Sequence, residues 1–257
     1  MDAPTQTPST KINRWLPYLA VFQSDIRQTQ RSWVYRIWVL GSVLSAVGYM
    51  LYKVGVYQEA GRVLLASNVI SQLLLWIVLG SVALIVVLTA SCISGERDTV
   101  ADSVLSRGIS RYQYFLAKWH ARLVTVIGTF FAMLILVLLS SHFFLETDLQ
   151  LWGAAVAVMT VGVLFMAVTT LGVTFSAVSN SPLMSITLLW IILYGIGFVL
   201  NFLPARFPSP YRMLTHLPQI LRGEYSMHEL GQLSMWCGIL SLVAALFGLT
   251  YFSRRDV

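Results

Sequence analysis

Charged side chains are scarce in this sequence and are absent over long runs. Only 11% of its 257 residues are charged, whereas 57% are hydrophobic. Soluble domains carry about 25% charged residues, so this composition excludes an ordinary soluble globule. Long uncharged runs include 63–95, 123–145 and 149–205. The composition therefore favours a single membrane-embedded body.

Common catalytic motifs are missing as well. The sequence has no GxxxxGK[ST], no HExxH and no GxSxG, the patterns that cradle phosphates, bind zinc and present a nucleophilic serine. Its four histidines are dispersed: His120, His142, His216 and His228. We therefore expect no enzymatic activity, no catalytic residue, no metal site and no cofactor in this chain. The basic residues form no stripe, so nucleic acid is not an expected partner.

Six apolar segments are long enough to cross a bilayer. A helical crossing needs about 20 mostly apolar residues, and these segments are solid apolar blocks without the alternation of barrel strands. The turn signal Asn180-Ser181-Pro182 divides the long run after Asp148. The predicted fold is an all-α polytopic membrane protein with a six-helix transmembrane domain at 34–252 and a short tail at 253–257. Its spans lie at 34–52, 69–93, 123–141, 151–177, 183–203 and 230–252.

The distribution of lysine and arginine predicts the orientation. If both chain ends share one side, that side holds 12 of the 17 basic residues. Cytoplasmic loops carry the excess of basic residues. We therefore expect a multi-pass protein of the plasma membrane, the bacterial inner membrane, with both termini in the cytoplasm and membrane lipid as a partner.

The N-terminal arm, residues 1–33, contains an amphipathic pattern. Apolar residues recur at helical spacing, and the positions between them, including Asp25, are polar. This pattern is typical of a helix lying in the membrane interface, although a helix packed on a soluble partner has the same periodicity. The apolar residues are Trp15, Leu16, Leu19, Phe22 and Ile26.

The loop between the second and third spans gathers charge of both signs. Residues 94–122 carry eight of the 28 charged side chains of the chain. We expect two short helices at the cytoplasmic surface, with Gly108 breaking the first and Ser110 capping the second, which starts at Arg111 and runs into the third span. A basic loop would suffice to set topology, whereas interleaved acids favour a protein-docking surface.

The segment 204–230, before the last span, is too short to cross the membrane and too apolar to be a solvent-exposed loop. Ser209-Pro210 predicts a helix start, Pro218 a kink or an end, and Gly223 a stop. Five apolar residues follow helical spacing: Met213, Leu214, Leu217, Ile220 and Leu221. We expect a re-entrant or interfacial helix pair on the outer side.

Three stretches together resemble ABC-2-type permeases, the membrane subunits of one class of ABC exporters. Ile93, Glu96 and Arg97 are similar to the end of the second helix in that family. The family's leucine-serine-x-proline-x-serine-arginine string is similar to Leu105-Ser106-Arg107-Gly108-Ile109-Ser110-Arg111 in this sequence. The glycine-lysine that follows it in the family is similar to Ala117-Lys118. Tyr251-Phe252-Ser253-Arg254-Arg255-Asp256-Val257 resembles the usual ending. Gly108 replaces the proline and Ala117 the glycine.

The resemblance implies a division of labour. A separate cytoplasmic ABC ATPase dimer would bind ATP and Mg²⁺, and this chain with a second copy or a homologue would form the transmembrane body. The loop at 94–118 would hold the coupling helix. The residues implied in ATPase coupling are Glu96, Arg97, Asp98, Asp102, Leu105, Arg107, Ser110 and Arg111.

Two functions remain open for such a subunit. The chain could convert ATPase motion into export of a substrate that the sequence does not identify. Alternatively, it could transmit force to a periplasmic or extracellular partner with little or no translocation, as in the similar permease of nitrous-oxide reductase maturation.

Overall fold

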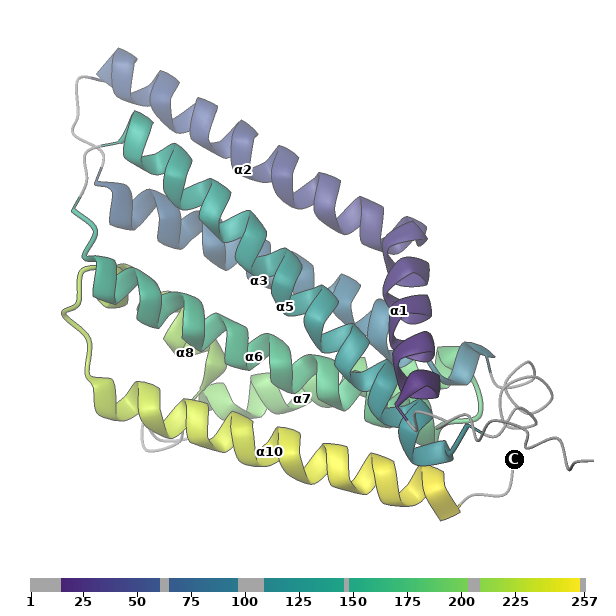
Figure 1. The fold of residues 1–257 in the computed structure, drawn as a ribbon. Coiled ribbons are helices and arrows are strands. Elements are labelled where there is room, and N and C mark those ends of the chain that lie inside the picture. The colour runs from purple at the N-terminus through teal and green to yellow at the C-terminus, as the bar shows by residue number, and fades with distance from the viewer. Residues whose placement is uncertain (1–14, 61–64, 97–108, 146–147, 203–208, 255–257) are drawn as a thin grey trace, which may run out of the picture.

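The computed structural model describes residues 15–60, 65–96, 109–145, 148–202 and 209–254. Over these residues the chain forms nine α-helices and one short 3-10 helix and contains no strand, which confirms the all-α prediction (Figure 1). The long helices are α2 (Trp33–Ala60), α3 (Ala66–Ala90), α5 (Arg111–Phe144), α6 (Leu151–Val178), α7 (Pro182–Phe202) and α10 (Met227–Arg254). The shorter ones are α1 (Leu16–Arg31), η1 (Ser94–Glu96), α8 (Pro210–Thr215) and α9 (Leu217–Leu221).

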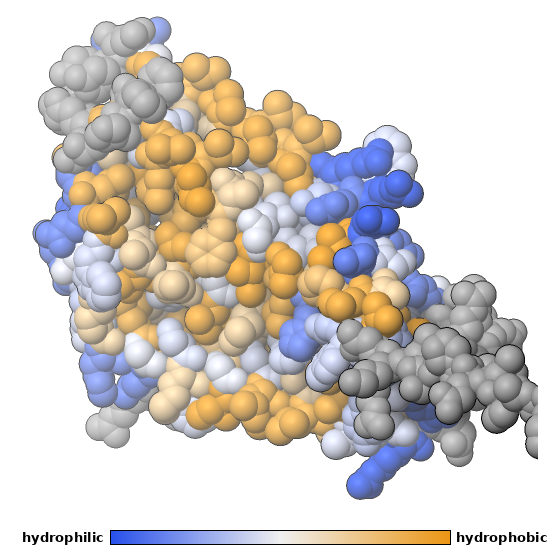
Figure 2. Space-filling view, in the orientation of Figure 1, coloured by the Kyte–Doolittle hydropathy of each residue, from blue (hydrophilic) through white to orange (hydrophobic). Residues whose placement is uncertain are grey.

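The six long helices are each long and apolar enough to span a membrane. Each overlaps one of the six predicted spans, although α5 begins at Arg111, well before the predicted start of the third span at 123. The division at Asn180-Ser181-Pro182 is confirmed because α6 ends at Val178 and α7 begins at Pro182. Figure 2 shows hydrophobic surface over the middle of the bundle and hydrophilic side chains toward its two ends. The chain is therefore a multi-pass membrane protein.

The bundle has an inner pair of helices, α3 and α6, and a more exposed periphery. α6 packs against α3, α5, α7 and α10, and α3 and α6 are the most buried spans, whereas α2 and α7 are the least buried. α3 and α6 come unusually close at Gly172, where an added Cβ would overlap the side chain of Thr89. A glycine is needed there because only it allows this approach of the two backbones.

α1 lies across one end of the bundle at a steep angle to the spans and packs on α5 and α2 (Figure 1). The end of α10 is at this same end, which we call the α1 end (Figure 1). The opposite end, the distal end, holds the start of α3 and the turn from α9 into α10. The amphipathic prediction expects exposed apolar residues here, whether for the membrane interface or for a soluble partner, and Trp15 at the N-cap and Leu16 of α1 are 66% and 60% exposed. The prediction is wrong for Asp25, which is buried.

The segment between α7 and α10 forms two short helices at the distal end. Ser209 is the N-cap of α8 with Pro210 at its first turn, and Gly223 follows α9 in the left-handed conformation, with a φ of 74°. The five apolar residues predicted to share a face are all buried, and α9 packs on α3 and α6. Gly153 of α6 fits beneath α9, because a Cβ there would overlap the backbone carbonyls of Ile220 and Leu221.

Candidate functional site

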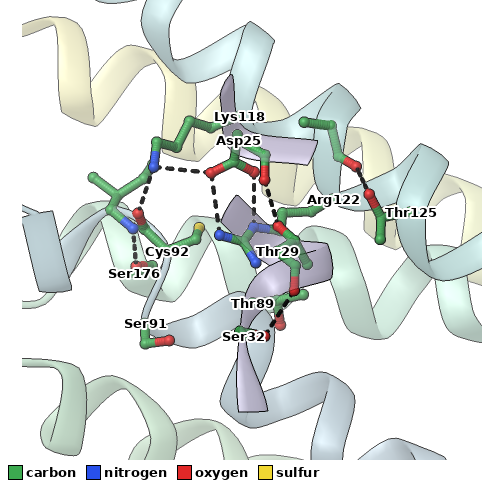
Figure 3. A network of polar contacts seen from close by, with 12 residues as sticks. Asp25, Thr29, Ser32, Thr89, Ser91, Cys92, Lys118, Arg122, Thr125 and Ser176 are labelled. Atoms are coloured by element: carbon green, nitrogen blue, oxygen red, sulfur yellow. Dashed lines mark hydrogen bonds and ion pairs between the residues drawn. The ribbon is translucent and has the colours of Figure 1, made fainter. Parts of the chain in front are cut away.

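The α1 end contains a cluster of buried charges. Three side chains on one face of α5, spaced four residues apart, contact α1 or η1: Tyr114, Lys118 and Arg122. Spacing of four residues places side chains on one helix face. Lys118 and Arg122 converge on the carboxylate of Asp25 from α1 (Figure 3). We call Asp25, Glu96, Lys118 and Arg122 the Asp25 cluster.

Asp25 bridges the two cations. Lys118 Nζ lies 3.0 Å from Asp25 Oδ1 and Arg122 Nε lies 2.9 Å from Oδ2. Arg122 also donates a hydrogen bond from Nη2 to Oδ1 at 3.1 Å. The side chains of Asp25, Lys118 and Arg122 are only 1%, 3% and 7% exposed. Both carboxylate oxygens of Asp25 are thus occupied by cations from a single helix.

Glu96 joins the same cluster from the exit of α3. Its Oε2 lies 2.6 Å from Lys118 Nζ and accepts a hydrogen bond from the Tyr114 hydroxyl at 3.1 Å. The Glu96 side chain is 27% exposed, so it forms the solvent-facing edge. The cluster contains two cations and two anions, and this balance is what permits burial, because an unpaired buried charge carries a desolvation penalty of several kcal/mol.

The turn that leads out of α3 has further anchors on the other helices. Lys118 Nζ donates to the Cys92 carbonyl at 3.0 Å. Ser176 on α6 accepts hydrogen bonds from the backbone N–H groups of Ile93 and Ser94, at 2.8 and 3.0 Å. These contacts engage backbone groups just beyond Ser91, the C-cap of α3, and so define where the turn lies. The turn at 91–96 is thereby fixed to α5 and α6, and through Lys118 to Asp25 on α1.

α1 is also held to α5 by contacts outside the charges. The Tyr18 hydroxyl is 2.9 Å from His120 Nδ1, and Val21 packs with Tyr114, Phe115 and Phe252. Burial raises the pKa of Tyr18 above its usual value, so its hydroxyl stays protonated. α1 therefore docks through one face that carries Tyr18, Asp25 and Thr29, and its exposed apolar residues lie elsewhere.

The predicted coupling residues are only partly within the described part of the chain. Five of them lie outside the described residues: Arg97, Asp98, Asp102, Leu105 and Arg107. Glu96 is in the Asp25 cluster. Ser110 caps α5 as predicted, accepting from the Gln113 N–H at 3.2 Å in a capping box, and Arg111 is the first residue of that helix.

Sequence reasoning missed Asp25, Lys118 and Arg122 as a unit. The sequence analysis places Lys118 and Arg122 in the mixed-charge loop at 94–122, and Asp25 on the polar face of an interfacial helix. The available signal was the spacing of Tyr114, Lys118 and Arg122 at i, i+4 and i+8, together with an aspartate as the only acidic residue of the α1 segment. Two cations on one apolar helix face require an anion nearby, but the sequence does not say which segment provides it.

The distal end has a smaller polar cluster, which we call the Asp148 clasp: Ser67, Asn68, Asp148 and Arg222. Asp148 accepts from the Ser67 N–H at 2.8 Å and lies 3.3 Å from Arg222 Nε. Arg222 also donates to Ser67 Oγ at 2.9 Å and to Asn68 Oδ1 at 3.2 Å. The clasp ties the start of α3 to the residue that ends α9.

Two opposing effects set the ionisation of Asp148. Partial burial disfavours its charged form, but hydrogen bonds from Ser67 and the nearby Arg222 charge outweigh burial, so the pKa of Asp148 lies below its usual value. Asp148 therefore stays ionised, and its ion pair with Arg222 stays formed, through the physiological pH range.

No protein-family model matches this chain, and no curated protein matches it.

Proposed function

We propose that this protein is the membrane subunit of an ABC-type exporter, in which a separate cytoplasmic ATPase dimer drives motion through the loop that follows Glu96. The resemblance of residues 93–118 and 251–257 to ABC-2-type permeases supports this proposal. A second copy of the chain, or a homologue, completes the transmembrane body, and the α1 end faces the cytoplasm of a bacterial cell.

The observation that carries the proposal is the anchoring of the turn at 91–96. The ammonium group of Lys118 contacts the Cys92 carbonyl, the Glu96 carboxylate and the Asp25 carboxylate of α1. Ser176 holds Ile93 and Ser94 to α6. A push on the loop beyond Glu96 is therefore delivered to three helices at once, because packed elements joined by buried contacts move together.

Charge reversal at Glu96 tests this proposal. The tagged chain is purified from native membranes together with any ABC ATPase that it retains, and ATP turnover is measured in proteoliposomes. In the Glu96→Arg variant we expect turnover to fall at least about tenfold, because a third cation beside Lys118 displaces the turn and because like charges at a contact cost several kcal/mol. ATP turnover should fall less in the Glu96→Gln variant, which keeps a hydrogen-bond acceptor for Tyr114.

Glu224→Arg is the matched control, because Glu224 is exposed at the distal end. It makes the same change of charge far from the turn and should leave turnover unchanged. The melting temperature of each variant separates loss of coupling from loss of folding. The proposal fails if no ABC ATPase is retained, or if a well-folded Glu96→Arg variant turns over ATP at the rate of the control.

The structure of the distal end favours a second candidate, a subunit that transmits force to an extracytoplasmic partner without a transport path. Leu217, Ile220 and Leu221 of α9 are buried against α3 and α6, and the Asp148 clasp fastens α9 there. A firmly packed outer end suits transmission better than an exit. Retention of an extracytoplasmic protein by the purified complex, with ATP turnover that depends on that protein, would favour this candidate over export.

A further inference from the structure

A groove runs along the bundle surface between α2, α3 and α5. It encloses a volume of about 400 Å³, which is within the range of about 300–1,000 Å³ typical of ligand sites. Its walls include Ala46, Met50, Val54, Ile77, Met133 and Val137. The rim residues Val47, Leu51 and Leu136 are 51%, 66% and 60% exposed, so the groove opens onto the side of the bundle.

The position of the groove restricts what can enter it. All of its walls belong to segments that are apolar enough to span the membrane, so the medium around it is hydrocarbon. The hydroxyl of Ser140, which also lines the groove, already donates to the Val137 carbonyl at 2.9 Å. A polar ligand would lose its hydrogen bonds to water on entering the groove, and the walls offer few hydrogen-bonding groups to replace them. The interior of the groove therefore matches an alkyl chain.

One cation stands at the distal end of this groove. Lys53 follows the wall residues Met50 and Leu51 and precedes Val54, and it is the only charged residue of α2 between Arg36 and Glu59. It lies three residues before the end of the apolar span at Val56, where a lysine side chain can extend to the headgroup region.

Tyr49 holds the ammonium of Lys53 beside the groove. Lys53 Nζ is 5.3 Å from the centroid of the Tyr49 ring, a cation–π distance. The Tyr49 hydroxyl in turn donates to Gln72 Oε1 of α3, which fixes the ring between the two helices. No carboxylate forms an ion pair with Lys53 within the described residues, so its charge remains available to an external anion.

We propose that this groove binds one anionic phospholipid, with an acyl chain between α2, α3 and α5 and the phosphate paired with Lys53. The apolar walls select the chain, and the cation at the end where the groove meets the interface selects an anionic headgroup. This site is independent of any ATPase, so the proposal stands or falls separately from the exporter function.

Native mass spectrometry of the purified protein tests the proposal. The full chain is delipidated in detergent and then titrated with phosphatidylglycerol or with phosphatidylcholine of the same acyl chains. We expect one tightly retained phosphatidylglycerol per chain, preferred over phosphatidylcholine by about fivefold, the ratio that one interfacial lysine confers. The Lys53→Gln variant should lose this preference, whereas Arg36→Gln, which removes an exposed cation at the other end of α2, should keep it.

Filling the groove should abolish retention of both lipids. Ala46→Trp places an indole in the groove, and Leu44→Trp, on an exposed position of α2 that does not line it, is the matched control. If Ala46→Trp lowers the melting temperature, Ala46→Leu provides a milder filling. The proposal is overturned if a folded Ala46 variant retains lipid like the control, if Lys53→Gln keeps the preference, or if the groove is closed by a second copy, so that lipid binds only to monomers.

Discussion

The two ends of the bundle hold polar clusters of opposite character. The Asp25 cluster joins four charged side chains, three of them almost fully buried, from α1, η1 and α5. The Asp148 clasp has one ion pair, whose side chains are 30% and 21% exposed, supplemented by Ser67 and Asn68. A dry cluster of balanced charges cannot lose one member without leaving another uncompensated. In a partly exposed ion pair, water can hydrate either side chain when its partner is lost.

This contrast assigns different mechanical roles to the two ends. At the α1 end, the turn at 91–96 and α1 share Lys118 as a common partner, so they move as one body. At the distal end, α9 is held on α3 and α6 mainly by burial of its apolar side chains, and the Asp148 clasp orients the end of that helix. If force enters through the loop after Glu96, the buried contacts of Lys118 and Ser176 pass it to α1, α5 and α6.

Removal of Asp25 should have the largest effect. Asp25→Ala leaves Lys118 and Arg122 buried beside a single remaining acid, Glu96, and breaking a buried charge cluster in this way costs about 3–5 kcal/mol. We expect a large drop in melting temperature and in the yield of monodisperse protein, measured by fluorescence-detected size exclusion after a heat step. Ser24→Ala, the exposed neighbour on α1, should behave as the wild type.

A double variant sharpens this prediction. Asp25→Leu combined with Arg122→Met removes one charge of each sign and leaves Lys118 paired with Glu96. The double variant should recover much of the stability that Asp25→Leu alone loses, because charge balance and burial are both restored. If the single and the double variants are equally unstable, the cluster does not act through charge balance.

Disrupting the packing of α9 should have an intermediate effect. In Gly153→Val the new side chain would meet the carbonyls of Ile220 and Leu221, which are backbone atoms and cannot rotate away. Overpacking of this kind typically costs about 1–3 kcal/mol, and here it would also move Arg222 away from Asp148. Gly41→Val on α2 is the control, since no atom lies within 4 Å of its Cβ position; equal melting temperatures for the two variants would contradict close docking of α9.

Much of this architecture was predictable because long uncharged runs and turn residues act locally. The six spans follow from the runs between charges, the α6–α7 break from Asn180-Ser181-Pro182, and the start of α5 from Ser110. Each of these signals lies within a few residues of its effect. The ranges of α8 and α9 also follow local signals, Pro210 and Gly223.

Pairing between distant segments was not predictable in the same way. Asp25 and Lys118 are 93 positions apart, and hydrophobic periodicity placed Asp25 on a polar face without saying whether water or protein covers it. The periodicity of α1 is ambiguous because its buried residues, Asp25 and Thr29, are polar. Arg222 and Asp148 likewise meet only after α9 has folded back onto α3 and α6.

Loss of the Asp148 ion pair in acid should change the melting temperature less than Asp25→Ala or Gly153→Val does. The pKa of Asp148 is lowered in the folded protein, so its contribution to stability is present above the unfolded pKa of about 3.9 and is lost as pH falls through the still lower folded pKa. Because the pair is partly exposed, the contribution is at most about 1 kcal/mol. Asp148→Asn should therefore melt slightly below the wild type at pH 7, and the difference should shrink as pH falls below about 3.9.

The same difference should shrink with added salt, since ions screen an exposed pair, whereas the loss caused by Asp25→Ala should be insensitive to salt. A difference between Asp148→Asn and the wild type that persists unchanged at acid pH would mean that Asp148 acts through packing instead of charge.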